Sequence, residues 1–107
     1  MISKKRIKQV VDQIVEGCRP EKIILFGSYG YGKPTKDSGL DIFVIAEIAA
    51  SSPERIRIVR RAIKERGFDI DVVVRTPQEV DRSLRGRDWF IQEVVEKGKV
   101  VYARRDS

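Results

Sequence analysis

The sequence predicts one α/β or α+β domain over residues 1–107, with elements in the order α-β-β-α-β-α-α-β. Its length of 107 residues is that of one ordinary domain. Stretches with apolar residues at helical spacing alternate with short apolar runs rich in β-branched residues. Glycine and proline fall between these stretches, where the chain must turn. Together these observations predict a sheet flanked by helices.

The first half of the chain predicts one helix and two strands. Residues 3–17 place apolar side chains three or four positions apart, which predicts an amphipathic helix. Lys22–Phe26 is a short apolar run and predicts a buried strand. The stretch Gly27–Gly39 contains four glycines and a proline, so it predicts a turn-rich connection. Leu40–Ala46 predicts the second strand.

The second half predicts three helices and two further strands. A Ser-Ser-Pro-Glu entry signal opens a helix that we expect to run from Ser51 to about Arg66. Phe68–Val74 predicts the third strand. A capping box at Thr76–Glu79 opens a short helix, and Trp89–Val95 marks the last helix. We expect Trp89 to lie in the core, and Lys99–Ala103 to form the closing strand.

The composition excludes several kinds of catalytic and metal site. The chain has no histidine, which removes Ser-His-Asp and Cys-His catalysis and every zinc site that needs imidazole. One cysteine, Cys18, excludes an internal disulfide and a cysteine-cluster metal site. The remaining chemistry uses carboxylates, hydroxyls, cations and backbone amides, which favours hard cations and phosphates.

The charge distribution and the short apolar runs limit the expected cellular compartment and the expected partners. No apolar run exceeds the five residues Ile42–Ala46, so we expect no transmembrane helix and no signal-peptide core. A single thiol favours the cytoplasm. Basic residues cluster at Lys4–Lys8 and at Arg55–Arg66 within a formal net charge of +6. We expect these clusters to be solvated helix faces, although such clusters also meet phosphates or acidic proteins.

Three features in the central part of the chain can carry chemistry. Gly27-Ser28 leaves a buried strand, and glycine there lets backbone amides approach an anion. Asp41 stands at the head of an apolar strand, where an ionised carboxylate must lie at the rim, pair with a cation side chain or bind a cation. Asp71 shares one strand face with Asp69 and is also compatible with an exposed strand edge.

In combination these residues resemble a known family. The order Leu25-Phe26-Gly27-Ser28, ten intervening residues, Gly39-Leu40-Asp41-Ile42-Phe43-Val44 and later Ile70-Asp71-Val72-Val73 is similar to the minimal nucleotidyltransferases of the DNA polymerase beta-like superfamily. Members of that family are often paired in bacteria and archaea with a helical HEPN protein. The resemblance covers almost the whole chain and implies a small nucleotidyltransferase fold, with a mixed β-sheet flanked by helices.

The resemblance also implies roles for four of these residues. Gly27 and Ser28 match the turn that holds the nucleotide phosphates, and Asp41 and Asp71 match two of the three aspartates that bind divalent cations, here Mg²⁺. Such cations bridge phosphate oxygens and stabilise both the attacking and the leaving oxygen. Asp71 would in addition accept the proton of an incoming hydroxyl.

The sequence departs from the family pattern at two places. Gly39 stands where the family has its first metal-binding aspartate, a difference compatible with natural degeneracy, an introduced substitution or a tolerated variation. Asp37 lies about 13 Å from Asp41 along an extended strand, too far to supply the missing ligand, whereas Asp69 would have to bend inward. We therefore expect one weakly held Mg²⁺ rather than a tight two-metal site.

The second departure is Gly30-Tyr31, where relatives carry a small residue and arginine. Lys33 and Lys36 are the candidates to replace that cation at the phosphates. Tyr31 would pack on the loop or stack on a base.

Two functions follow from the resemblance. In the first, the chain is an enzyme that transfers AMP from ATP to a hydroxyl, implied to be a tyrosine of a HEPN partner, and acts as the antitoxin of the pair. In the second, the chain keeps the fold but not the activity because of Gly39, and it neutralises its partner by forming a hetero-oligomer. Binding of nucleic acid is not expected, since the sequence has no basic stripe with interleaved aromatic residues.

Overall fold

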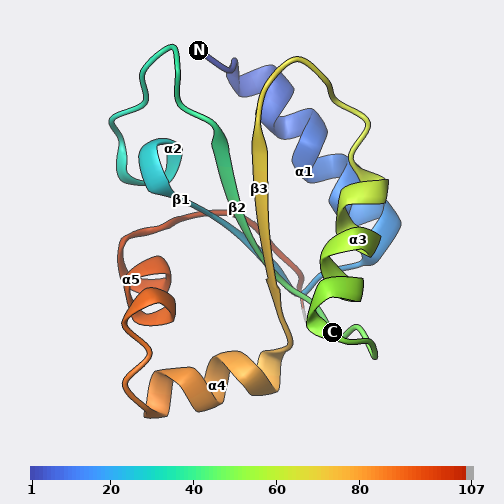
Figure 1. The fold of residues 1–107 in the computed structure, drawn as a ribbon, viewed down its shortest axis with the longest axis vertical. Coiled ribbons are helices and arrows are strands. Elements are labelled where there is room, and N and C mark those ends of the chain that lie inside the picture. Colours follow the sequence, from blue (N-terminus) through green and yellow to red (C-terminus); the bar gives the residue numbers. More distant parts are fainter. Residues whose placement is uncertain (106–107) are drawn as a thin grey trace.

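The computed structural model describes residues 1–105, which form a four-stranded sheet and five helices (Figure 1). The elements follow one another along the chain as α1 (Lys4–Cys18), β1 (Lys22–Phe26), α2 (Gly27–Tyr31), β2 (Leu40–Ile45), α3 (Ser52–Ala62), β3 (Ile70–Arg75), α4 (Pro77–Arg85), α5 (Trp89–Lys97) and β4 (Lys99–Ala103). The mixed sheet flanked by helices confirms the predicted fold class. Every predicted strand is present, and one short helix, α2, was not predicted.

The sheet has the strand order β3-β2-β1-β4, and it mixes two kinds of pairing. β1 is antiparallel to both of its neighbours, β2 and β4. β2 and β3 are parallel, so the chain crosses from one to the other through α3. Parallel pairing starts both strands at the same end of the sheet, with Leu40 opposite Ile70 and Asp41 opposite Asp71. This register decides where the functional residues meet.

Each face of the sheet carries its own layer of helices and its own core (Figure 1). On one face, α1 and α3 cover alternate strand residues such as Leu25, Ile42 and Val74. On the other face, α4 and α5 cover the residues in between, among them Ile24 and Phe43. Because side chains alternate along a strand, Asp41 and Asp71 share the second face, the one that α5 covers.

The helix α2 forms within the stretch that the sequence predicted to be only a turn. Its first residue, Gly27, has a φ of +62°, a left-handed conformation that glycine adopts at little cost and other residues rarely do. The helix ends at Tyr31, and the residue that caps it, Gly32, has a φ of +93°. With two glycines inside it and no side-chain cap, its sequence carries little helix propensity, which is why the pattern did not reveal it.

The helix α3 ends at Ala62, four residues before the predicted end, and β3 begins at Ile70 rather than at Phe68. Contacts with α1 hold the intervening segment in an extended path. The Lys64 backbone N–H donates to the Gln13 side chain at 2.7 Å, and the Arg6 guanidinium lies 4.6 Å from the centre of the Phe68 ring. These tertiary contacts outweigh the local helix preference of the segment.

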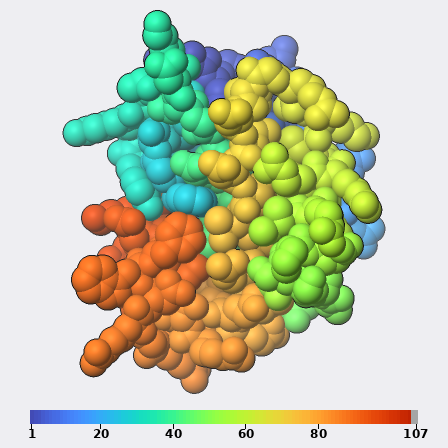
Figure 2. Space-filling view, viewed as in Figure 1, coloured from blue at the N-terminus to red at the C-terminus, as the bar shows by residue number. Residues whose placement is uncertain are grey.

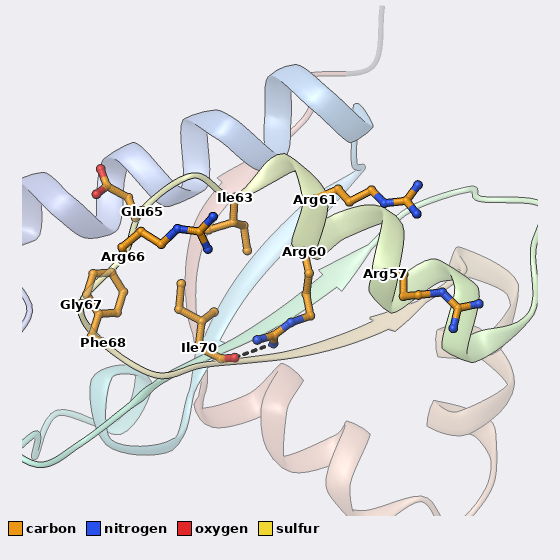
Figure 3. A pocket seen from close by; sticks show the side chains of 9 residues that line it. All are labelled: Arg57, Arg60, Arg61, Ile63, Glu65, Arg66, Gly67, Phe68 and Ile70. Atoms are coloured by element: carbon orange, nitrogen blue, oxygen red, sulfur yellow. Dashed lines mark hydrogen bonds between the residues drawn. The ribbon is translucent and has the colours of Figure 1, made fainter.

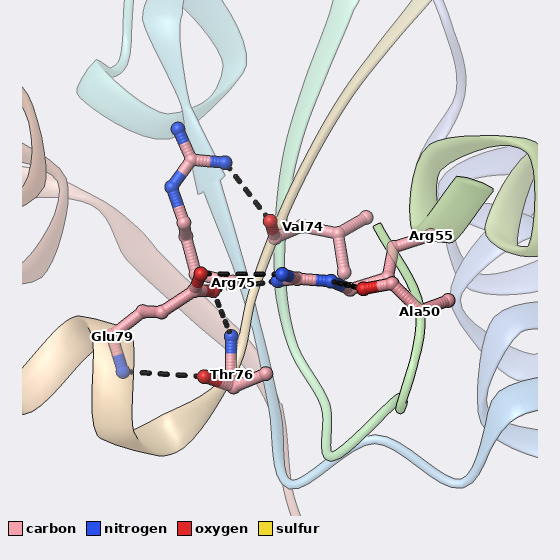
Figure 4. Close-up of polar contacts among 6 residues, drawn as sticks. All are labelled: Ala50, Arg55, Val74, Arg75, Thr76 and Glu79. Carbon is pink, nitrogen blue, oxygen red and sulfur yellow. Dashed lines mark hydrogen bonds and ion pairs between the residues drawn. The ribbon is translucent and has the colours of Figure 1, made fainter. Parts of the chain in front are cut away.

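Arg55 belongs to the basic cluster predicted to be a solvated face, but the structure buries it. It is 8% exposed, and its guanidinium binds both carboxylate oxygens of Glu79, at 2.6 and 3.2 Å (Figure 4). Its Nε donates to the Ala50 carbonyl at 3.0 Å. Glu79 is the last residue of the predicted capping box, so this pair joins α3 to the start of α4.

Trp89 corrects another expectation, because its side chain is 82% exposed at the start of α5. The neighbouring Phe90 makes the internal contacts instead, edge-on to Phe26 and Phe43 at centroid distances of 5.3 and 6.3 Å. Helical spacing alone does not distinguish two adjacent aromatic residues at a helix start. Within residues 1–105, none of the helices has the length and apolar character needed to cross a membrane.

Candidate functional site

The turn after β1 brings Gly27 against Asp41. Phe26, the last residue of β1, is paired with Asp41 at the start of β2, so the chain turns directly beside this carboxylate. A Cβ atom built on Gly27 would lie 2.1 Å from Oδ2 of Asp41. No other residue type fits this approach without displacing the carboxylate. The predicted phosphate turn and the predicted metal-binding aspartate are therefore neighbours.

Asp71 lies directly opposite Asp41 across the parallel pair β2–β3. The pKa of the Asp41 carboxyl is raised, first by burial, then by the negative charge of Asp71 and by a hydrogen bond with its side chain. Asp71 itself is exposed at the rim. Two carboxylates in contact repel each other when both are ionised, and a cation between them would remove that repulsion.

Tyr31 lies in the same region, although the sequence had only suggested loop packing or base stacking for it. The pKa of its phenol is raised, first by burial and then by the charges of Glu93 and Asp41, while a hydrogen bond with the Gly27 backbone lowers it. Figure 2 shows the surface of α2 next to that of α5, with β3 beside both. Tyr31 thus lies near Asp41 and Glu93, and the sequence signal for it was its place in the family motif, where relatives carry arginine.

Gly39 lies beside Asp69, one position before the first strand pair of β2 and β3. A Cβ atom built on Gly39 would lie 3.2 Å from the Asp69 carbonyl oxygen and 3.3 Å from the Asp69 Cβ. The φ of Gly39 is outside the left-handed region, so the backbone accepts other residues. A side chain at position 39 would therefore fit only if the exposed Asp69 segment moved by a few tenths of an ångström.

The remaining predicted phosphate-binding residues lie at different distances from this centre. The Ser28 carbonyl accepts hydrogen bonds from the backbone N–H groups of Gly32 and Lys33, at 3.1 and 3.0 Å, which closes the turn. The Lys33 side chain is exposed. Lys36 lines a depression of about 470 Å³ together with Gly39 and Asp69. The structure brings Gly27, Asp41 and Asp71 together, whereas contact of either lysine with a phosphate stays a prediction.

The same residues offer a small donor set for a metal ion. Among residues 1–105, no group of three or more acidic or cysteine side chains is gathered closely enough to enclose a metal ion. Asp41 and Asp71 offer two carboxylates at one point, with the raised pKa of Asp41 marking uncompensated negative charge. This set fits one divalent cation whose other ligands are phosphate oxygens and water. It does not fit a three-carboxylate site for two ions.

The other part of the basic cluster lines a separate cavity of about 470 Å³ between α3 and β3 (Figure 3). Arg57, Arg60, Arg61 and Arg66 reach it from α3 and from the loop that follows. Arg60 donates to the Ile70 carbonyl oxygen at 2.6 Å. Ile70 belongs to the face of the sheet that α1 and α3 cover, so these arginines do not surround the carboxylate pair.

Comparison with known proteins places the chain in a family. Residues 5–107 match the family described as "Polymerase beta, Nucleotidyltransferase". The "Putative protein adenylyltransferase MJ0604" of Methanocaldococcus jannaschii is 29% identical over 95% of this chain and 100% of its own length. The "Putative protein adenylyltransferase MJ1305" of the same organism is 25% identical over 96% of this chain and 76% of its own length.

Two solved structures share the fold. The crystal structure of a "putative nucleotidyltransferase from Sulfolobus solfataricus" aligns with a TM-score of 0.67 and 23% identity, over 94% of this chain and 79% of that one. A mutant of the toxin-antitoxin MntA-HpeT aligns with a TM-score of 0.59 and 22% identity, over 97% of this chain and 76% of that one. With a family match that spans nearly all of its length, the chain belongs to the polymerase beta-type nucleotidyltransferases, and its enzyme class is nucleotidyltransferase.

Proposed function

We propose that this chain transfers AMP from ATP to a hydroxyl group of a partner protein. One observation carries the proposal: Asp41 and Asp71 meet across β2 and β3 directly beside the Gly27 turn. This combination places two carboxylates and a close backbone approach within one small area, as a bound nucleotide and a divalent cation require. The names of the two Methanocaldococcus relatives support protein as the acceptor class.

The reaction balances with the groups named. The acceptor oxygen bonds to the α-phosphorus of ATP, the bond from that phosphorus to the bridging oxygen of the β-phosphate breaks, and pyrophosphate leaves. A divalent cation, proposed to be Mg²⁺, would supply charge neutralisation at the phosphates when bound. Asp41 and Asp71 would hold that cation, and Gly27 and Ser28 would bind the phosphates. The acceptor proton would pass to the carboxylate pair, with Asp71 as the exposed member that an acceptor can approach.

The acceptor is proposed to be a tyrosine hydroxyl of a HEPN-type protein, with this chain as the antitoxin of a cytoplasmic pair. The fold shared with the toxin-antitoxin MntA-HpeT structure supports a toxin–antitoxin context.

A second candidate function is neutralisation of the partner by complex formation without transfer. Gly39 favours it, since this position carries no carboxylate and the remaining donor set is small. In that case the chain would form a stable hetero-oligomer that needs neither ATP nor Mg²⁺.

A transfer assay separates the two functions. The chain is incubated with ATP labelled at the α-phosphate, Mg²⁺ and the protein encoded by the neighbouring gene, as the proposed acceptor. Asp41→Ala and Gly39→Asp variants run in parallel. Label on the partner above the Asp41→Ala background supports the enzyme. Label only with the Gly39→Asp variant, together with a stable complex of the unmodified chain, supports neutralisation by binding.

A further inference from the structure

A groove with a volume of about 620 Å³ lies between the N-terminal half of α1, the helix α2 and the strand β4. We call it the α1–β4 groove. Apolar side chains dominate its lining, among them Ile2, Ile7, Val11, Leu25, Val101 and Tyr102. Val11 and Leu25 are buried in the core, and the other four are half-buried. The groove therefore exposes one side of an apolar cluster that continues into the interior.

The groove is open because α3 covers only part of this face. Gly17, near the end of α1, is so close to α3 that a Cβ on it would lie 2.8 Å from the Cβ of Ala62. The start of α1 lies away from this crossing (Figure 1). There the Ile2 backbone N–H donates to the Tyr29 hydroxyl at 2.8 Å, which holds the N-terminal residues against α2. The groove is thus shaped by packed elements.

The rim of the groove is basic. Lys4, Lys8 and Lys99 border it from α1 and β4, and all three are exposed. The acidic residue in the lining, Asp12, is paired with Lys8 at 2.8 Å, so its charge is compensated within α1. Lys4 and Lys99 therefore give the rim a positive potential. This accounts for part of the basic cluster at the start of the chain, which the carboxylate site does not use.

We propose that the α1–β4 groove docks an amphipathic segment of a partner protein that carries acidic residues beside apolar ones. Exposed apolar grooves with polar rims mark protein contacts, and a helix laid into such a groove buries its apolar face. Lysines on both sides select glutamate and aspartate at the flanks of that segment. A second copy of this chain fits less well, since a two-fold interface through the groove would set the lysine rims against each other.

The groove and the carboxylate pair lie on opposite faces of the sheet. Leu25 points into the groove, whereas its neighbour Phe26 and the paired Asp41 belong to the face of α5. A partner held in the groove leaves the Gly27–Asp41 area free. The proposal consequently stands whether or not AMP is transferred, and its test does not depend on that reaction.

Binding of designed peptides tests the proposal. The probe is a helical peptide of about four turns with leucine on one face and glutamate on the rest. Two matched peptides carry lysine in place of glutamate or serine in place of leucine. Affinity is measured by fluorescence anisotropy, and the contact surface is mapped by amide chemical shifts. We expect binding of the leucine–glutamate peptide alone, with shifts centred on Ile7, Val11 and Val101.

Two pairs of variants identify the contact. Lys4→Glu combined with Lys99→Glu should lower the affinity for the leucine–glutamate peptide at least about tenfold. Lys5→Glu combined with Lys64→Glu changes the net charge equally outside the groove and should leave affinity within about twofold. Val101→Thr keeps the side-chain shape and should weaken binding, whereas Val95→Thr on α5 should not.

Several results would overturn the proposal. They are equal binding of the lysine peptide, shifts centred on the arginine-lined cavity of α3, and equal effects of the two charge-reversal pairs. A concentration-dependent dimer that Val101→Thr disrupts would assign the groove to a second copy. Binding of phosphatidylglycerol vesicles that Lys4→Glu and Lys99→Glu abolish, without peptide binding, would assign it to a lipid surface. Magnesium binding at Asp41 should be unchanged in all these variants.

Discussion

Asp41 on β2 and Asp71 on β3 lie directly opposite each other across the parallel pair, and the pKa of Asp41 is raised first by its burial and then by the charge of Asp71. Their contact is a product of the register, since each aspartate is the second residue of its strand. Proteins rarely keep two carboxylates in contact without a cation or a shared proton, because both cannot ionise freely. Substitutions at this pair should therefore change both the pH dependence of stability and the affinity for a metal ion.

Replacing Asp41 by asparagine should stabilise the metal-free protein at neutral pH. Because its pKa is raised in the folded state, ionised Asp41 lowers the free energy of unfolding above that pKa. Protonation relieves the loss as the pH falls through the folded-state value toward the ordinary value of about 3.9. The advantage of Asp41→Asn should thus vanish at low pH, as measured by thermal unfolding across pH. The exposed loop residue Asp37 provides the control variant Asp37→Asn, and an equal gain there would contradict the prediction.

Placing a carboxylate at position 39 should strengthen metal binding. The Cβ of Gly39→Asp would lie 3.2 Å from the Asp69 carbonyl oxygen, so the exposed Asp69 segment must shift by a few tenths of an ångström. We expect magnesium affinity to rise by at least about tenfold, because affinity follows the number of charged ligands. Calorimetric titration measures it. Gly39→Asn adds nearly the same volume without the charge, and an equal gain with asparagine would show that charge is not the cause.

Alanine at position 27 should cost more than alanine at position 32. Both glycines have a positive φ, at +62° and +93°, so either substitution strains the backbone by about 1–2 kcal/mol. At Gly27 the new Cβ also meets Oδ2 of Asp41 at 2.1 Å, whereas at Gly32 none of the described residues lies within 4 Å. Denaturant unfolding should show the larger loss for Gly27→Ala. In an Asp41→Ala background the difference between the two positions should shrink, and additivity would contradict the proposed contact.

The ion pair between Arg55 and Glu79 should make the free energy of unfolding depend on pH in the acidic range. The pKa of Glu79 is lowered to about 2, chiefly by the hydrogen bond from Arg55 and then by the Thr76 backbone N–H. Its contribution is present above the ordinary value near 4.5 and is lost as the pH falls toward 2. Glu79→Gln should cost about 1–2 kcal/mol at pH 7, a value reduced for solvent screening because the Glu79 side chain is 35% exposed.

The pH dependence of that cost checks its origin. Glutamine keeps one oxygen for the Thr76 backbone N–H, but its amide nitrogen cannot accept from Arg55, so the variant removes the charge together with one hydrogen bond of the pair. The difference between wild type and Glu79→Gln should fall steadily between pH 5 and pH 2 in denaturant titrations. A difference that stays constant with pH would mean that packing, not the ion pair, is responsible.

The two aromatic residues at the start of α5 should contribute unequally to stability. Trp89 is 82% exposed, so Trp89→Ala should change the free energy of unfolding by less than about 0.5 kcal/mol. Phe90 contacts Phe26 and Phe43, and Phe90→Ala should cost about 2 kcal/mol. Circular dichroism is the suitable probe, since Trp89 is the one tryptophan of the chain. Comparable losses for both variants would place Trp89 in a packed environment.

Much of the fold was predictable because its signals are local. The apolar pattern of α1, the Thr76–Glu79 capping box and the four apolar strand runs each lie within one short stretch. Local signals failed where distant contacts dominate. The end of α3 depends on Gln13 and Arg6 of α1, and the burial of Arg55 depends on a carboxylate 24 positions away.

The candidate site divides in the same way. The residue types Gly27, Asp41 and Asp71 were recognisable in the sequence, and so was the missing carboxylate at Gly39. The sequence did not reveal that Gly27 touches Asp41, that Gly39 lies beside Asp69, or that Tyr31 lies near Asp41. Those relationships depend on strand register, because a slip of one residue would move every side chain of the strand to the other face of the sheet.

The sequence by itself determined the chemistry available to this protein: no histidine, a glycine turn, and two carboxylates at strand heads. It also determined most of the elements, α2 and the end of α3 excepted, because capping, periodicity and turn residues act over a few positions. Only the tertiary structure decided which carboxylates meet, which arginine is buried, and where an apolar groove stays open beside a lysine rim. Those properties depend on how separate elements pack, because packing brings together residues that are far apart in the sequence and whose contact no local pattern predicts.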